Sequence, residues 1–306
     1  MPSDKTVVVA ELYRRYKAGD FPDGIVSSEH LVEAIDAVGS TLSKRNTANF
    51  LKDLLRSPAL RENWPAEAIA ERVFARQRYG ERRVMQFYHY PEGSDPFAPE
   101  FEPNNLTPIH SLQTASIPYL ARSLGRSEET WLMQMAVQLR LVETQLALSS
   151  PTRLAARLRD VVHLQTGIKT QPEIDGAWLA TYGMFEGDEV MNVLVTCEVK
   201  RHRERILVNQ IREQVAKSFE ITANLTHARI DAVKPLAITI VRHPYEGRTE
   251  PMIFVIEFEH IGRSEYEAMD LGNNFEALFE LDLRPVSNAL YRPVPAIPAL
   301  GRPTGD

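Results

Sequence analysis

Two acidic side chains and a lysine in the middle of the chain have a spacing that could support metal-assisted hydrolysis. Glu198 and Lys200 lie two residues apart at the end of the β-branched run 193–199. Successive side chains of a strand point to opposite faces, so these two share one face and the apolar residues that alternate with them share the other. Asp175 lies at the start of an earlier apolar segment. Carboxylates on neighbouring strands suit a hard cation such as Mg²⁺, and a lysine beside them can orient the attacking water and stabilise charge on a phosphate.

Two strands and a helix are needed to position these residues. The sequence predicts strands over Glu173–Tyr182 and Met191–Lys200, because both are apolar and are separated by turn residues within 183–188. A helix is predicted over Arg203–Phe219, where apolar residues recur with the helical period. The acidic residue, the E-x-K strand and the following helix would then meet at one end of a sheet.

This arrangement resembles the PD-(D/E)xK nuclease superfamily, the fold of many type II restriction endonucleases. The match covers residues 143–217, with Asp175 as the first acid and Glu198-Val199-Lys200 as E-x-K. The resemblance implies an α/β protein with a restriction-endonuclease-like mixed sheet flanked by helices. It also implies Mg²⁺-dependent cleavage of double-stranded DNA. The first half-motif reads Pro172-Glu173-Ile174-Asp175, so Glu173 is an alternative ligand; small residues after Asp175 favour Asp175, because they would let a metal ion and a phosphate approach.

Two further residues enter the expected site through the resemblance. Glu143 lies on a helix predicted over Ser127–Ser149, and in related nucleases a helical glutamate before the first strand can complete the metal site. An exposed glutamate at the edge of the apolar stripe is the alternative. Gln210 lies ten residues beyond Lys200, where several branches of the superfamily place a glutamine facing the site. A surface amide is its alternative.

The N-terminal residues 1–95 are predicted to form a small helical domain that recognises DNA. Helices are expected over 7–17, from Ser27 or Ser28 to Val38, over 44–56 and over 66–76. The second and third of these, joined by a short turn, have the helix-turn-helix layout, and residues 78–90 resemble the wing hairpin of a winged helix. The candidate DNA contacts on the helix 44–56 are Lys44, Arg45, Asn46 and Asn49.

The remaining chain is expected to form the nuclease domain, residues 106–284, and a proline-rich, loosely held tail, residues 285–306. A helix is predicted over Thr152–His163, further strands over 236–242 and 252–259, and a helix near 265–271. Residues 91–105, rich in proline, glycine and acidic side chains, are the expected domain boundary.

Composition and charge are compatible with a DNA-binding protein of the cytoplasm. The net charge is −6, but ten Lys and Arg face five Asp and Glu between residues 40 and 90, and six face two between 200 and 217. Local potential steers a polyanion more than net charge does, and Arg201 and Arg203 lie beside the expected site. The single cysteine, Cys197, excludes an internal disulfide, and no apolar run could span a membrane.

The sequence therefore predicts a Mg²⁺-dependent endonuclease, most simply a type II restriction enzyme. Cutting both strands of a duplex needs two active sites, so a two-fold homodimer is expected. A repair, recombination or mobile-element nuclease of the same fold is the first alternative. A DNA-binding regulator whose E-x-K is only a structural ion pair is the second.

Overall fold

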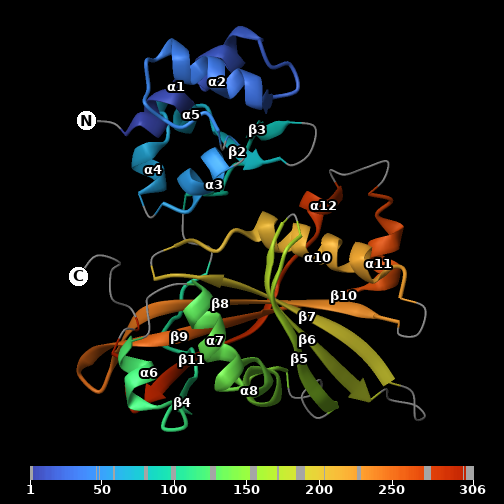
Figure 1. Ribbon diagram of the computed structural model, residues 1–306. Helices are drawn as coiled ribbons and strands as arrows, with labels where there is room; N and C mark the ends of the chain where they lie inside the picture. Colours follow the sequence, from blue (N-terminus) through green and yellow to red (C-terminus); the bar gives the residue numbers. More distant parts are fainter. Residues whose placement is uncertain are drawn as a thin grey trace. The chain divides into compact units, whose positions relative to one another are not determined.

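The computed structural model of the chain forms two compact units, Met1–Glu100 and Phe101–Asp306 (Figure 1). The structure describes residues 3–45, 47, 49–57, 59–78, 82–97, 101–124, 129–151, 157–170, 172–183, 190–202, 204–225, 229–271, 277–298 and 300. Each unit has its own sheet and its own buried core. None of the helices in these ranges has the length and apolar character needed to cross a lipid bilayer.

The first unit packs short helices against a small antiparallel sheet. Its elements are α1 (Asp4–Ala18), β1 (Ile25–Ser27), α2 (Ser28–Ala37), α3 (Asn49–Leu55), α4 (Leu60–Asn63), α5 (Ala66–Ala70), β2 (Val73–Gln77) and β3 (Arg83–His89). The strands lie in the order β1-β3-β2. The first two predicted helices are confirmed. Gly19, with φ of 88°, ends α1, and the Ser27 side chain caps α2 by accepting a hydrogen bond from the His30 N–H.

The prediction of a helix over 44–56 is wrong at its N-terminal end. Helix α3 begins only at Asn49, and Lys44 and Arg45 lie in a bend before it. Ser43 does not cap a helix there, because its Oγ accepts a local hydrogen bond from the Arg45 N–H at 3.3 Å. Lys44 is held away from α3 by an ion pair with Asp36.

The predicted helix over 66–76 ends early. Helix α5 stops at Ala70, and Arg72 takes a positive φ of 55°, which turns the chain into β2. Val73, Phe74 and Ala75 are buried and pair with β3. Strands β2 and β3 form a hairpin, as the sequence predicts for residues 78–90, but the hairpin begins earlier than expected.

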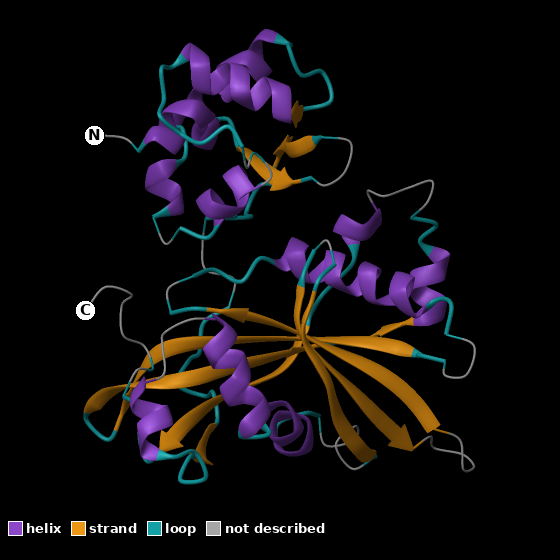
Figure 2. Ribbon diagram, viewed as in Figure 1, coloured by secondary structure: helices purple, strands orange, loops and turns teal. Residues whose placement is uncertain are grey.

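The second unit is built on a large, curled mixed sheet (Figure 2). Its strands are β4 (Ile109–Gln113), β5 (Leu158–Ile168), β6 (Ile174–Gly183), β7 (Val190–Lys200), β8 (Ala232–Tyr245), β9 (Arg248–Phe258), β10 (Ile261–Gly262) and β11 (Pro285–Val294). Within the described residues the order is β4-β11-β9-β8-β7-β6-β5, and β10 pairs with β8. Strands β5, β6 and β7 are antiparallel, and β8 returns parallel to β7.

Helices cover both faces of this sheet (Figures 1 and 2). The helices are α6 (Tyr119–Leu124), α7 (Glu129–Gln138), α8 (Leu141–Leu148), α10 (Val208–Thr222), α11 (Arg263–Ala268) and α12 (Ala277–Glu280). One core joins α7 and α8 to one face, and a second core joins α10 to the other. Along β7, Val195, Cys197 and Val199 belong to the first core, whereas Leu194 belongs to the second. This alternation places Glu198 and Lys200 on the α10 face.

Four predictions for the second unit need correction. The helix expected over 127–149 is broken between α7 and α8, where Arg140 has φ of 50°. The helix expected over 152–163 is strand β5 from Leu158 onward, and residues 152–156 lie outside the described residues. The helix expected from Arg203 begins at Val208. The segment expected as a loose tail forms β11, whose buried residues pair with both β4 and β9.

Candidate functional site

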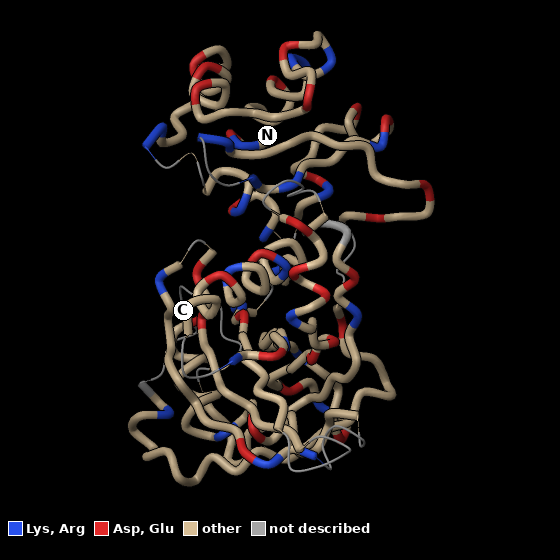
Figure 3. The backbone as a smooth tube through the Cα atoms, turned by 90° about the vertical axis from the view of Figure 1, so that its right-hand side faces the viewer, with Lys and Arg blue, Asp and Glu red and all other residues tan. Residues whose placement is uncertain are grey.

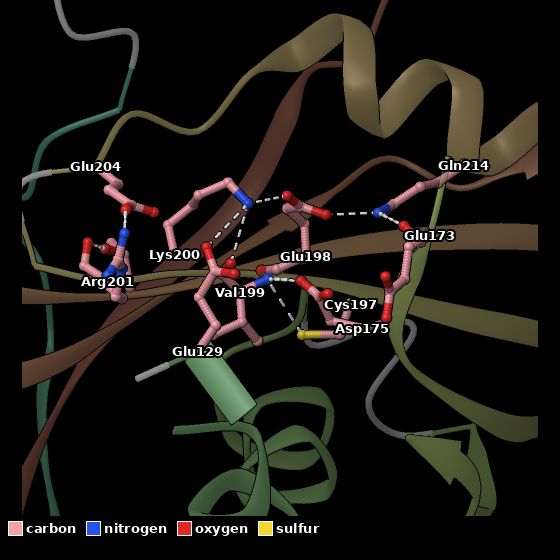
Figure 4. A network of polar contacts seen from close by, with 11 residues as sticks. Glu129, Glu173, Asp175, Cys197, Glu198, Val199, Lys200, Arg201, Glu204 and Gln214 are labelled. Atoms are coloured by element: carbon pink, nitrogen blue, oxygen red, sulfur yellow. Dashed lines mark hydrogen bonds and ion pairs between the residues drawn. The ribbon is translucent and has the colours of Figure 1, made fainter. Parts of the chain in front are cut away.

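Asp175 on β6 and Glu198 on β7 lie close together on adjacent strands (Figure 4). The β6–β7 pairing ends at Gly176 and Cys197, and Asp175 and Glu198 are the residues directly beyond this last pair. Asp175 is further fixed by the Val199 N–H, which donates to its Oδ2 at 2.8 Å.

Glu198 is fully buried and held through both carboxylate oxygens. Lys200, 1% exposed, donates from Nζ to Glu198 Oε1 and also to the Val199 carbonyl at 3.1 Å. Gln214 on α10 donates from Nε2 to Glu198 Oε2 at 2.5 Å and to the Glu173 carbonyl at 2.8 Å. The carboxylate therefore has one charged and one neutral donor, as buried charges generally require.

A third acidic residue, Glu129, joins this cluster from the first turn of α7 (Figure 4). Its Oε1 lies 3.5 Å from Lys200 Nζ. The sequence predicts a helix over Ser127–Ser149 but assigns Glu129 no role at the site. Acidic residues in the first turn of a helix usually stabilise the helix start, so their types alone could not reveal the contact with Lys200.

Asp175 titrates far from its ordinary range. Burial and, after it, the negative charge of Glu198 raise its pKa to about 7, while Lys200 and the Val199 N–H oppose the shift. Burial, with the charges of Asp175 and Glu198, also raises the pKa of the Cys197 thiol, which faces the other side of β7. Two carboxylates thus meet where one lysine compensates only part of their charge.

Gly176 is the first of the small residues after Asp175, and the structure gives it a packing role. A Cβ at this position would lie 2.8 Å from Met133 Cε and 2.8 Å from Trp178 Cζ3. Gly176 therefore makes room for α7 on the opposite face of the sheet. The glycine does not open space for a metal ion or a phosphate beside Asp175.

Glu143 and Gln210 form no hydrogen bond or ion pair with Asp175, Glu198 or Lys200 in the described part of the chain. Glu143 lies on α8 and is ion-paired with Arg140 at 3.6 Å, because the helix break separates α8 from the start of α7. Gln210 is buried on α10, one turn before Gln214, and its Oε1 has no hydrogen-bond partner among the described residues. It is Gln214 that contacts Glu198.

The residues predicted to contact DNA differ in their exposure and in their partners. Arg45 and Asn49 are exposed, Lys44 pairs with Asp36, and Arg201 donates from Nε to Glu204 Oε1 at 2.8 Å. Asn46 and Arg203 lie outside the described residues. Figure 3 shows basic and acidic positions interspersed within the first unit rather than gathered on one basic face.

A second buried lysine–glutamate pair lies on the other face of the same sheet. Lys234 on β8 contacts Glu257 Oε1 at 2.6 Å, and both side chains are buried. Ser150 and Ser287 donate to the two Glu257 oxygens at 2.7 and 2.8 Å. This pair is enclosed by hydrogen bonds within the core, whereas the Glu198–Lys200 pair lies beside the additional carboxylates of Asp175 and Glu129.

The side chains of Asp175 and Glu198 offer carboxylate oxygens, which are ligands that a hard divalent cation prefers. Among the described residues, no group of three or more His, Cys, Asp or Glu side chains is arranged to hold a metal ion. Two carboxylates remain, and Mg²⁺ is typically bound by one or two carboxylates together with water and substrate phosphate oxygens. Burial, followed by the negative charge of Glu198, raises the pKa of Asp175, so this site favours the uncharged form of the carboxyl. The two carboxylates thus fit Mg²⁺ and do not form an all-protein cage.

No family model, no characterised protein and no solved structure matches the chain. The arrangement of two neighbouring carboxylates beside a buried lysine can bind a hard cation and place an ammonium next to a negatively charged substrate.

Proposed function

We propose that this protein hydrolyses phosphodiester bonds of double-stranded DNA with the help of Mg²⁺. The observation that carries the proposal is the contact of Asp175 with the Val199 N–H, directly beside Glu198, together with the bond from Lys200 to Glu198. Asp175 and Glu198 are 23 positions apart in the sequence, and an isolated E-x-K would not require them to meet.

The connectivity around the site supports a restriction-endonuclease-like fold. Antiparallel strands β5, β6 and β7 are followed by α10 and by β8, which is parallel to β7. Helices cover both faces, so the sheet is mixed and flanked by helices, as the resemblance implies. The acids and the lysine come from β6 and β7 at one end of this sheet.

In this proposal Asp175 and Glu198 hold the cation, with Glu173 left as an alternative to Asp175. Mg²⁺, when bound, supplies a water of lowered pKa and neutralises charge on the phosphate. Lys200 orients the attacking water and stabilises the charge that develops on the phosphate oxygens. Gln214 keeps the Glu198 carboxylate in place, and Glu129 holds the lysine from the side of α7.

We further propose that the first unit reads DNA and that the protein acts as a homodimer, as a type II restriction enzyme would. The small unit combines a helix pair with the β2–β3 hairpin, an arrangement compatible with a winged helix. Arg45 is exposed next to the start of α3 and is the residue to test for base recognition. Arg45→Ala should relax or weaken sequence recognition, while unchanged specificity would exclude this role.

Cleavage of supercoiled plasmid or phage DNA with Mg²⁺ tests the activity. Wild-type protein should produce discrete fragments, whereas Asp175→Ala and Lys200→Ala should bind the same DNA without cutting it. Binding is measured by electrophoretic mobility shift with Ca²⁺ in place of Mg²⁺. If both variants cut as fast as wild type, these residues are not the site.

A non-catalytic DNA-binding regulator is the second candidate. The observation that favours it is the Lys234–Glu257 pair, which shows that this sheet also uses a buried lysine and glutamate for structure alone. Wild-type protein that binds DNA and never cuts it would establish the regulator. Discrete fragments lost in Asp175→Ala would exclude it.

A further inference from the structure

Lys200 contacts Glu198 Oε1, an oxygen atom that the metal ion would use in the proposed function. Its Nζ donates to Glu198 Oε1, lies 3.5 Å from Glu129 Oε1 and donates to the Val199 carbonyl at 3.1 Å. Figure 4 shows the ammonium between the carboxylates of Glu198 and Glu129. The side chain is only 1% exposed.

We propose that Lys200 is an internal cation that a divalent metal ion displaces from Glu198, an inference that rests on the proposed function. The ammonium and the metal ion compete for the same oxygen, Glu198 Oε1. Metal binding then frees the ammonium to turn toward the phosphate. The lysine is thereby available for hydrolysis only when the metal is in place.

The neighbouring residues allow this exchange without rebuilding the site. Gln214 holds Glu198 Oε2 and Asp175 is held by the Val199 N–H, so neither carboxylate depends on Lys200 alone for its orientation. A lysine carries a compact charge on a flexible stem with rotatable bonds, so its Nζ can move while Cα stays fixed in β7. Glu129, in the first turn of α7, offers the displaced ammonium a second anionic partner.

If the metal ion displaces Lys200, removing the lysine charge should raise the Mg²⁺ affinity. If Lys200 only assisted metal binding, the same change should lower the Mg²⁺ affinity. Lys200→Gln removes the competing charge but keeps a neutral donor for Glu198. It should bind Mg²⁺ at least about tenfold more tightly than wild type, because a unit charge at contact distance in a partly desolvated site is a strong repulsive influence on a cation. Lys200→Arg keeps the charge and should show no such gain.

The measurement is titration calorimetry of the full chain with Mg²⁺ alone, without DNA, supported by thermal unfolding at increasing Mg²⁺. Lys234→Gln is the matched control, because it removes a buried lysine from a glutamate on the other face of the same sheet. Lys200→Gln should gain more thermal stability from Mg²⁺ than wild type does, whereas Lys234→Gln should gain the same increment as wild type. If Lys200→Gln folds poorly without metal, Lys200→Met prepared in Mg²⁺ and titrated after dialysis provides the second variant.

The outcomes separate this inference from the proposed activity. Equal or weaker Mg²⁺ affinity of Lys200→Gln and Lys200→Met overturns the displacement, even if wild-type protein cuts DNA. An equal gain in Lys234→Gln overturns it too, since the effect would then be one of general charge. Tighter Mg²⁺ binding by Lys200→Gln, with no cleavage by wild type, supports the displacement and refutes the nuclease. No Mg²⁺ binding by wild type or by either Lys200 variant refutes both.

Discussion

Gln214 ties α10 to both strands that carry the acidic residues. Its Nε2 donates to Glu198 Oε2 on β7 and to the carbonyl of Glu173, the residue immediately before β6. A single amide group therefore fixes the carboxylate and the strand opposite it. Gln210, one helical turn earlier, makes no corresponding contact through its Oε1 within the described residues.

Gln214→Ala should destabilise the second unit by about 1–3 kcal/mol, because the buried Glu198 carboxylate and the Glu173 carbonyl lose their donor. Cleavage should fall as well, because Glu198 loses its fixed orientation. Gln210→Ala is the matched control and should cost less stability, since it removes a buried amide oxygen without a described partner. Urea unfolding in a Trp64→Phe background, where Trp131 and Trp178 report on the second unit, measures the difference. A larger loss for Gln210→Ala would contradict the assigned roles.

The raised pKa of Asp175 predicts how stability depends on pH without metal. Its pKa is about 7 in the folded protein and 3.8 in its ordinary state, so folding favours the protonated form. The contribution to stability is complete below about pH 4 and is lost as pH rises through 7. Relative to Asp175→Asn, which stays neutral, the wild-type free energy of unfolding should fall by several kcal/mol over this interval, since one pKa unit corresponds to about 1.4 kcal/mol.

Urea unfolding of both proteins between pH 4 and pH 8, in EDTA, tests this dependence. The two curves should meet near pH 4 and diverge with Asp175→Asn the more stable protein at pH 8. Mg²⁺ at pH 8 should then stabilise wild type and leave Asp175→Asn nearly unchanged, because only the carboxylate gains from a cation. Parallel pH profiles would show that Asp175 is solvated and is not part of a desolvated acidic pair.

Local sequence patterns predict which residues share a face of one strand, but they do not predict which strands and helices come together at the site. The β-branched run 193–199 predicts a strand. Glu198 and Lys200 share a face of this strand because its side chains alternate with a period of two. The approach of Asp175 to Glu198 depends on the register between β6 and β7. The residue types between the two strands do not determine that register. The contact from Glu129 depends on tertiary packing of α7, for which no local pattern exists.

The errors in secondary structure have local physical causes. Residues 158–163 contain apolar residues that satisfy a helical period, but the β-branched pair Val161-Val162 belongs to a strand that pairs with β6. The break before α8 occurs at Arg140, which has a positive φ. No glycine or proline stands at this position to predict the break. The prolines of β11 suggested a loose tail, but Pro285 is the first residue of the strand, where its missing N–H is tolerated.

Glu129 and Glu143 offer a direct test of which helical glutamate serves the site. Glu129 lies 3.5 Å from Lys200 Nζ, whereas Glu143 pairs with Arg140. Glu129→Gln should lower the single-turnover cleavage rate about tenfold, the usual scale for a residue that orients a neighbour of the metal ligands. Glu143→Gln, the same change on α8, should cut DNA at the wild-type rate. A loss in Glu143→Gln alone would restore the expectation from the sequence.

A substitution of Gly176 distinguishes a role of this glycine in packing from a role in substrate access. In Gly176→Ala the new methyl group would meet Met133 and the Trp178 ring, so the second unit should lose about 1–3 kcal/mol of stability, the usual cost of overpacking a core. Met133→Ala in the same chain should recover part of this loss, because the methyl group would then have space. The Mg²⁺ affinity of Gly176→Ala, measured by calorimetry, should stay at the wild-type value. A weaker affinity with unchanged stability would show instead that the glycine keeps space open beside Asp175 for the metal ion and the phosphate.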